Sequence, residues 1–195
     1  MNQAGEKNRS VRNTKRKLRE GLLQLMEKKP VNEISVKELT DLVDINRGTF
    51  YFHYQDIYDL LRQIEDDFFE QFDGMLGKER SSPSATGYPY LHMVFSFLGD
   101  NRDFCRIMLG PHGDIQFVDR VKKRVDAQCS YFWELLAPGA DRERYGMYNT
   151  FIINGCVGLI QEWVTADNGN LTVDNITELT ATVILTSVAP SIQLG

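Results

Sequence analysis

The chain has few of the residues that build disulfides and metal sites. Among 195 residues there are only three cysteines and three histidines. Cys105, Cys129 and Cys156 are odd in number and lie among apolar residues, which favours buried free thiols in a reducing cytoplasm over disulfides. The sequence contains no HExxH, paired CxxC, GxSxG or phosphate-binding glycine loop. We therefore predict that the chain has no metal ion, no cofactor and no enzymatic activity.

Long apolar runs are also lacking. No stretch approaches the roughly 18 apolar residues that a membrane-spanning helix needs. The first ten residues, MNQAGEKNRS, are polar and charged, so we expect no secretory signal there. Sustained alternation of apolar and polar residues, which is typical of strands, does not occur. We expect an all-α, cytoplasmic protein with no membrane partner.

Charge is distributed unevenly along the chain. Residues 1–55 contain eleven Lys and Arg against seven Asp and Glu, a formal charge of +4, whereas residues 56–195 carry −9. A basic N-terminal part attracts the phosphate backbone of DNA, and an acidic remainder is repelled by it. The alternative is that the basic N-terminus is a flexible, solubilising tail.

Two short helices with a tight connection are marked by their capping residues. Ser35 followed by Glu38 has the spacing of a capping box, which predicts a helix starting after Ser35. Asn46 is a good N-cap for a second helix, from Arg47 to about His53. Only residues 43–45 lie between the two, and Asp44 is the residue there that best tolerates positive φ. This spacing indicates a helix-turn-helix unit.

The second short helix has an unusual surface. Helical spacing places Phe50 against the preceding helix, while Arg47, Thr49, Tyr51 and Phe52 point elsewhere. Gly48 costs about 1 kcal/mol of helix propensity relative to alanine, which suggests that another group approaches the backbone closely there. A phosphate or a base edge is a reasonable candidate for that group.

The remaining helices are predicted from apolar periodicity and from breaks at Pro, Gly and Asn. A helix over residues 15–28 should end near Pro30, and Asp56 should cap a long helix that reaches about residue 75. Residues 78–88 read as a loop. The helices expected after this loop cover residues 90–98, 102–109, 115–136, 141–165 and 173–188.

The run VDINRGTFYFHYQDIYDLL, preceded by TKRKLREGLLQLMEKKPVNEISVKEL, resembles the N-terminal domain of the tetracycline-repressor (TetR) family of bacterial transcription regulators. This resemblance covers about residues 10–65. The segments NRDFCRIML and GLIQEWV resemble, more loosely, a C-terminal domain found in many members of the family. The resemblance implies a three-helix DNA-binding domain over residues 1–55 and a larger helical effector-binding and dimerisation domain over residues 56–195.

The resemblance also implies a DNA-binding site. The helix from Arg47 to His53 would enter the major groove. At the position of Phe52, members of the family often have a basic residue, so this chain departs from the pattern and would exchange a polar contact for apolar contact with a thymine methyl. Side chains of this helix and of the preceding one would contact bases and phosphates. The predicted DNA-binding residues are Ser35, Lys37, Asn46, Arg47, Gly48, Thr49, Tyr51, Phe52 and His53.

The last two predicted helices carry apolar stripes that suit a homodimer. Paired with a two-fold copy, they would form a four-helix interface. The resemblance favours this, because two recognition helices about 34 to 36 Å apart are needed to read a palindrome. The alternative is that both stripes face the chain's own core. The predicted interface residues are Ile152, Gly155, Leu159, Trp163, Ile176, Leu179 and Val183.

A small-molecule pocket is predicted within the C-terminal helices. Aromatic walls with a few polar groups are typical of ligand sites, although ordinary core packing uses the same residues. The predicted lining is Tyr90, Phe95, Met108, Trp133, Asn154 and Trp163.

The sequence therefore predicts a homodimeric repressor that binds double-stranded DNA at a palindromic operator. An unknown small-molecule effector would modulate its affinity for DNA. One alternative is an adaptor or co-activator of the same fold whose C-terminal domain binds a protein partner. An enzyme that modifies a small molecule is a third possibility, and turnover of a bound compound would reveal it.

Overall fold

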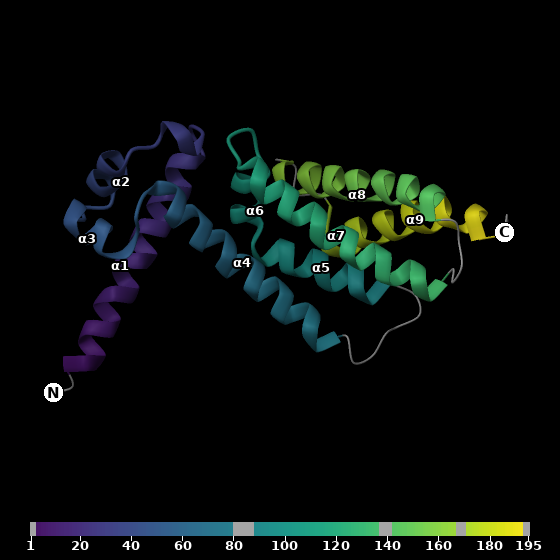
Figure 1. Ribbon diagram of the computed structural model, residues 1–195, viewed down its shortest axis with the longest axis horizontal. Coiled ribbons are helices and arrows are strands. Elements are labelled where there is room, and N and C mark those ends of the chain that lie inside the picture. Colours follow the sequence, from purple (N-terminus) through teal and green to yellow (C-terminus); the bar gives the residue numbers. More distant parts are fainter. Residues whose placement is uncertain (1–2, 80–87, 137–141, 167–170, 193–195) are drawn as a thin grey trace. The chain divides into compact units, whose positions relative to one another are not determined.

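The computed structural model describes residues 3–79, 88–136, 142–166 and 171–192 (Figure 1). Within these ranges, the side chains of residues 3–8, 78–79, 128–136, 142–145, 185 and 187–192 are not described. All regular structure in the described ranges is helical, with α-helices α1 to α9 and one short 3-10 helix. The all-α fold class is confirmed.

The chain divides into two compact units. The first contains Met1–Lys78 with Pro111–Asp114, and the second contains Glu79–Gly110 with Ile115–Gly195. By compactness the helix that follows Asp56 groups with the N-terminal helices. The functional division between residues 55 and 56 stays a prediction.

The first unit is built from α1 (Gln3–Met26), a 3-10 turn (Val31–Glu33), α2 (Val36–Leu42), α3 (Arg47–His53) and α4 (Ile57–Glu79). Helix α1 begins twelve residues earlier than the sequence predicted, because the charged N-terminal residues continue the helix instead of ending it. The core of the unit is apolar and closely packed. Its fully or almost fully buried side chains include Leu18, Leu22, Leu39, Phe50, Leu60, Leu61 and Ile64.

Gly21 allows α1 to approach α2 closely. A β-carbon on Gly21 would lie 3.0 Å from Leu39 Cδ1 and closer still to Val43 Cγ1. Any larger residue there would therefore force the side chains of Val43 and Leu39, or the helices that carry them, to move. Local sequence patterns carry no signal for this contact, because it joins residues about twenty positions apart.

Two polar connections hold α4 in place within the first unit. At its start, the backbone N–H of Asp59 donates to Asp56 Oδ1 at 2.7 Å, and the N–H of Gln55 donates to Asp59 Oδ2 at 3.0 Å. Further along, Arg19 of α1 forms an ion pair with Asp67 at 3.1 Å and donates to the Ile64 carbonyl at 3.2 Å. The predicted cap at Asp56 is confirmed, whereas the link from α1 was not foreseen.

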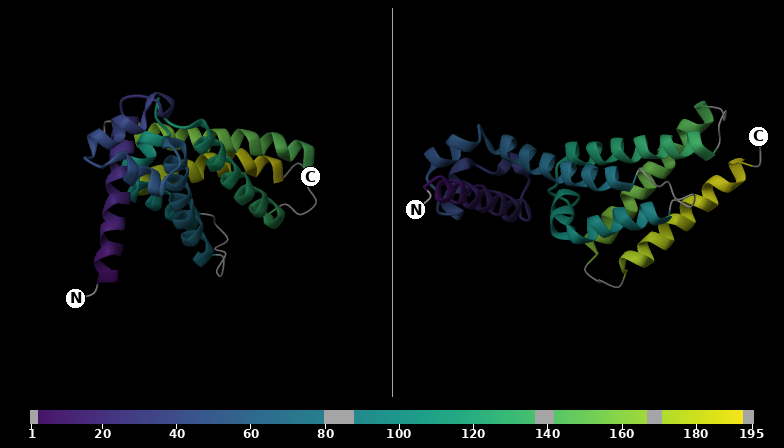
Figure 2. Two further views of the ribbon diagram at one scale, coloured as in Figure 1. Left: turned by 60° about the vertical axis from the view of Figure 1, so that its left-hand side comes forward. Right: turned by 90° about the horizontal axis from the view of Figure 1, so that it is seen from below.

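The second unit contains α5 (Tyr88–Asp100), α6 (Arg102–Met108), α7 (Ile115–Leu136), α8 (Arg142–Thr165) and α9 (Val173–Ile192). Each lies within a few residues of its predicted range, and most of the predicted loop at residues 78–88 falls outside the described residues. Helices α5 and α9 lie side by side, as do α7 and α8 (Figure 2).

Trp163 of α8 is a central core residue of the second unit. Its ring packs edge-to-face on Phe95 of α5, with centroids 5.6 Å apart, and its indole N–H donates to the Leu171 carbonyl at 2.9 Å. The Arg102 guanidinium lies 5.1 Å from the ring centroid and donates to the Trp163 carbonyl. One side chain thus connects three helices and the segment before α9.

Two of the cysteines have described side chains, and neither forms a disulfide. Cys105 is buried and Cys156 is half-buried, and burial raises the pKa of their thiols to about 12 and about 11 respectively. Both remain protonated near neutral pH, which makes them poor nucleophiles. The side chain of Cys129 lies outside the described residues.

None of the helices in the described ranges is long and apolar enough to cross a membrane.

Candidate nucleic-acid interface

The connection between α2 and α3 has the predicted geometry. Asp44 adopts φ 52°, the left-handed conformation that asparagine and aspartate tolerate best among residues with a side chain. The backbone N–H of Ile45 donates to the Thr40 carbonyl at 3.0 Å, which closes the turn. The helix-turn-helix unit is confirmed.

The two predicted helix caps of this unit are present. Ser35 Oγ accepts a hydrogen bond from the Glu38 N–H at 3.2 Å, and Asn46 Oδ1 accepts one from the Gly48 N–H at 2.7 Å. The Glu38 carboxylate accepts from Lys29 Nζ at 2.7 Å. It therefore connects α2 to the segment that follows α1, a contact that spacing alone did not reveal.

Helix α3 has one buried side and one exposed side. Phe50 is 0% exposed and packs near the rings of Tyr51 and Tyr54, with centroid separations of 5.5 and 5.7 Å. On the other side, the side chain of Phe52 is 78% exposed and that of Tyr51 is 59% exposed. Residues 47–49 are exposed as well. The predicted split of the helix surface is confirmed, and its exposed part combines a cation, a hydroxyl, a glycine and two aromatic rings.

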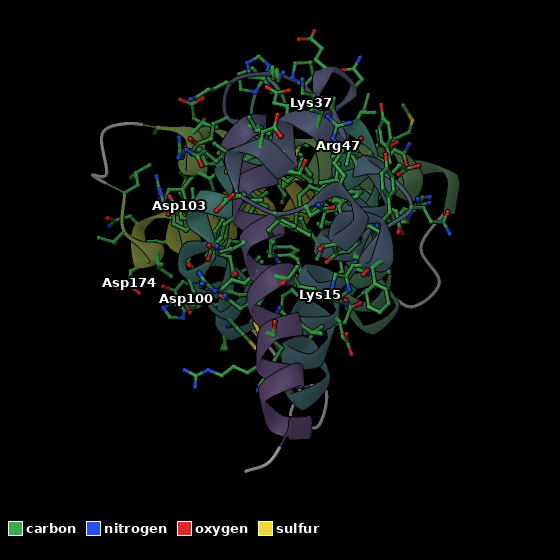
Figure 3. All side chains as sticks on the ribbon, turned by 90° about the vertical axis from the view of Figure 1, so that its left-hand side faces the viewer. Lys15, Lys37, Arg47, Asp100, Asp103 and Asp174 are labelled. Carbon is green, nitrogen blue, oxygen red and sulfur yellow. The ribbon has the colours of Figure 1, made fainter. Side chains whose placement is uncertain are left out.

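Basic side chains from other helices of this unit add to the exposed charge. Figure 3 labels Lys15, Lys37 and Arg47, which come from α1, α2 and α3 respectively. Lys37 and Arg47 are both exposed and stand near the starts of their helices. Lys15 Nζ lies 5.9 Å from the centroid of the Tyr54 ring. This cation–π contact joins α1 to the end of α3.

Elsewhere on α1, Arg9, Arg12, Arg16 and Lys17 are exposed. The Arg16 guanidinium is paired within its own helix, because it donates to both carboxylate oxygens of Glu20 at 2.9 Å. An exposed pair of this kind contributes little to stability.

His53 ends α3 in a partly buried position. Its ring meets Phe52 edge-on, with centroids 5.0 Å apart, and lies 6.2 Å from the Tyr54 ring. Burial lowers the pKa of the His53 imidazole, and the nearby Lys15 ammonium lowers it further. The free protein therefore favours the neutral ring, which can still donate one hydrogen bond.

The predicted pocket residues do not all lie together. Phe95 and Trp163 are buried and in contact, and Met108 is also fully buried. Tyr90 is half-buried, whereas Asn154 is exposed and donates to the Thr150 carbonyl of its own helix at 2.8 Å. The side chain of Trp133 falls outside the described residues. The small-molecule pocket stays a prediction.

The structure also divides the predicted dimer-interface residues. Ile152, Trp163 and Ile176 are buried in the core of the second unit, so these three serve intrachain packing. Leu159 is half-buried. The other members of the set are exposed, namely Gly155, Leu179 and Val183.

Other exposed apolar residues of α8 were missed by sequence reasoning. Met147 and Phe151 are 76% and 64% exposed. Gly155 and Gly158 continue the same side of the helix at helical spacing, and a β-carbon at either glycine would meet nothing within 4 Å. The spacing of residues 147, 151, 155 and 158 was the signal that could have located this side of α8. A second stripe of the same helix, which includes Ile152 and Trp163, is more apolar and was chosen instead, but the structure buries it.

Comparison with known proteins agrees with the observed architecture. A family profile described as "Transcriptional regulator C-terminal region", of the TetR type, matches residues 86–184. The HTH-type transcriptional regulator YxbF of Bacillus subtilis is 23% identical over 162 residues, which are 77% of this chain and 39% of that protein. The chain thus spans about two fifths of the length of this curated relative.

Solved structures share the fold over almost the whole chain. A TetR transcriptional regulator from Streptococcus agalactiae superposes with a TM-score of 0.67 at 19% identity, covering 93% of this chain and 98% of that one. DhaS, an activator of a dihydroxyacetone kinase operon, gives a TM-score of 0.56 at 17% identity, with 93% and 97% covered.

Within the described residues, a helix-turn-helix unit is followed by a helical second unit, and these solved regulators share that fold. The profile match covers half of the sequence, and the chain belongs to the TetR family of transcriptional regulators.

Proposed function

We propose that the chain binds double-stranded DNA at a palindromic operator, with α3 in the major groove. The observation that supports this best is the exposed side of α3, where residues 47–49 stand beside exposed Tyr51 and Phe52 while Phe50 anchors the helix. An exposed aromatic surface next to cations suits a nucleic acid, because Arg and Lys neutralise phosphates and apolar groups meet base edges.

Selection from a random-sequence duplex library, at two salt concentrations, tests this proposal. We expect an enriched palindrome whose affinity falls steeply with salt, since each neutralised phosphate releases counterions. On that duplex, Arg47→Ala should weaken binding by about 5- to 150-fold, the loss expected for a base or phosphate contact worth about 1–3 kcal/mol.

The matched control for Arg47→Ala is Arg62→Ala, which removes an exposed arginine of α4 outside the predicted site. It should leave operator affinity within about twofold. Equal affinities for the two variants, or a library with no enriched sequence, would contradict operator binding through α3.

The chain is proposed to act as a homodimer whose second copy covers the exposed apolar side of α8. Met147 and Phe151 supply the apolar area there, and Gly155 and Gly158 permit close approach of a second helix. Leu179 and Val183, exposed on α9, complete the proposed surface. A two-fold dimer of this kind matches a palindromic site.

Sedimentation equilibrium of the full chain measures the dimer directly. Phe151→Glu places a charge in the proposed interface and should shift the chain to monomers at micromolar concentration. Ile115→Glu, a control on the exposed start of α7, should leave the dimer intact. A wild-type monomer, or a dimer that survives Phe151→Glu, would exclude this surface. In either case, a different protein becomes the better candidate to cover the exposed apolar side of α8.

Repression modulated by a small molecule is the regulatory mode that we propose. An effector bound in the second unit would oppose DNA binding by a coupling free energy of about 1 to 3 kcal/mol. DhaS is named an operon activator, so the sign of regulation needs its own measurement. Transcription from a promoter carrying the selected operator, with and without the protein, decides between repression and activation.

A further inference from the structure

Phe52 is the most exposed large apolar side chain in the described part of the chain, at 78%. Along a helix, residues two positions apart point to nearly opposite sides, so the burial of Phe50 directs Phe52 outward. Residues three and four apart share a side, which places Phe52 beside Thr49 and Gly48. This outward ring is the feature to explain, because exposure of a whole phenyl group to water is unfavourable.

The surface next to Phe52 is open. A β-carbon on Gly48 would meet only Asn46 Oδ1, at 3.2 Å, and nothing else within 4 Å. The edge of the Phe52 ring is supported by His53, whose ring meets it at nearly a right angle. Gly48, Thr49 and Phe52 therefore lie together on the exposed side of α3. The backbone is accessible at Gly48, and the phenyl ring of Phe52 supplies an apolar surface beside it.

The chemistry of the phenyl ring restricts what it can contact on DNA. Phenylalanine has no atom that donates a hydrogen bond to a phosphate oxygen, whereas the neighbouring Tyr51 carries a hydroxyl that does. The edges of base pairs in the major groove present hydrogen-bond donors and acceptors, and the C5-methyl of thymine is the apolar group among them. The major-groove group that best suits the phenyl ring of Phe52 is therefore the methyl group of a thymine.

We propose that Phe52 selects one thymine in each operator half-site by contact with its C5-methyl group, with Gly48 leaving room for the base-pair edge. This inference rests on the proposed binding of α3 in the major groove. The two exposed aromatic residues then have different roles, since Tyr51 positions the helix on the backbone and Phe52 reads sequence.

Replacement of thymine by deoxyuridine tests the contact, because it removes the methyl group and retains every hydrogen-bonding atom of the base. The probe is the duplex selected from the library, with each thymine replaced in turn and symmetrically in both half-sites. At one position per half-site we expect binding to weaken by about fourfold per methyl, which corresponds to about 0.8 kcal/mol. The symmetric duplex should therefore lose about fifteenfold.

Variants of the full chain identify the side chain responsible. Phe52→Ala should bind the thymine and deoxyuridine duplexes equally, whereas Phe52→Leu should keep part of the preference. Tyr51→Phe is the matched control, since it should lower affinity for both duplexes and leave their ratio unchanged. Thermal melts should show that each variant folds, because the altered atoms are exposed.

The proposal is overturned if no deoxyuridine position weakens wild-type binding, or if Phe52→Ala keeps the wild-type ratio. In those cases, continued dependence of operator binding on Arg47 would show that the recognition helix is correct and that only the role of Phe52 is wrong. A library with no enriched sequence would overturn both the operator and the thymine contact.

Discussion

Two phenylalanines of α3, separated by one residue, should respond in opposite ways to the same substitution. Phe50 is 0% exposed and is surrounded by core side chains of the first unit, whereas Phe52 is 78% exposed. Phe50→Ala removes a buried ring and leaves a cavity, which costs about 3–5 kcal/mol of unfolding free energy. Phe52→Ala removes a ring from solvent and should change that free energy by no more than about 0.5 kcal/mol.

Both substitutions should weaken operator binding, but for different reasons. Phe50→Ala loosens the attachment of α3 to α2, so the recognition helix is no longer held in one geometry. Phe52→Ala leaves the helix in place and removes the proposed contact with the base. Urea unfolding measures the first effect, at one fixed protein concentration because the proposed dimer would couple stability to concentration.

Hydrogen exchange localises the loss of stability to α3. In Phe50→Ala, the amides of residues 50–54, which are bonded within the helix or at its end, should lose protection. In Phe52→Ala they should exchange as in the wild type. Equal unfolding free energies for the two variants would refute the orientation of α3, since that orientation alone distinguishes the two positions.

Helix caps and shifted pKa values lead to three more predictions. Asn46→Ala removes the side chain that caps α3 and should cost about 1 kcal/mol in urea unfolding, whereas Asn46→Asp should retain most of the stability; equal stability of all three proteins would contradict the cap. Because the pKa of His53 in the folded chain lies below its usual 6.5, the unfolded chain binds more protons, so stability should be lost as the pH falls below about 6.5. His53→Gln should show a smaller loss between pH 7 and 5, and an unchanged pH profile would exclude this residue as a contributor. In a Cys129→Ala background, Cys105 and Cys156, with thiol pKa values near 12 and 11, should resist a thiol reagent at pH 7.5 until urea is added; rapid labelling of either thiol in the folded protein would contradict its raised pKa.

Much of the local structure was predictable because it depends on residues close together in sequence. The caps at Ser35, Asn46 and Asp56 each use hydrogen bonds that span two or three residues. The turn at Asp44 required only a short connection and a residue tolerant of positive φ. Apolar periodicity located the helices of the second unit to within a few residues, because each must bury one side.

The side that a helix buries was harder to predict. In α8 two apolar stripes compete, and sequence reasoning assigned Ile152 and Trp163 to a dimer surface. The structure buries both in the chain's own core and leaves Met147 and Phe151 exposed. Periodicity shows that an apolar stripe exists, but not whether a neighbouring helix or a second chain covers it.

Capping chemistry, turn chemistry and helical periodicity in the sequence were thus sufficient to indicate an all-helical chain with a helix-turn-helix unit, since each acts over four residues or fewer. The close approach at Gly21, the ion pair of Arg19 with Asp67 and the environment of Trp163 join residues far apart in the chain. Which residues meet across such separations depends on how whole helices pack. Packing arises from the combined burial of many side chains, so it emerged only from the folded chain.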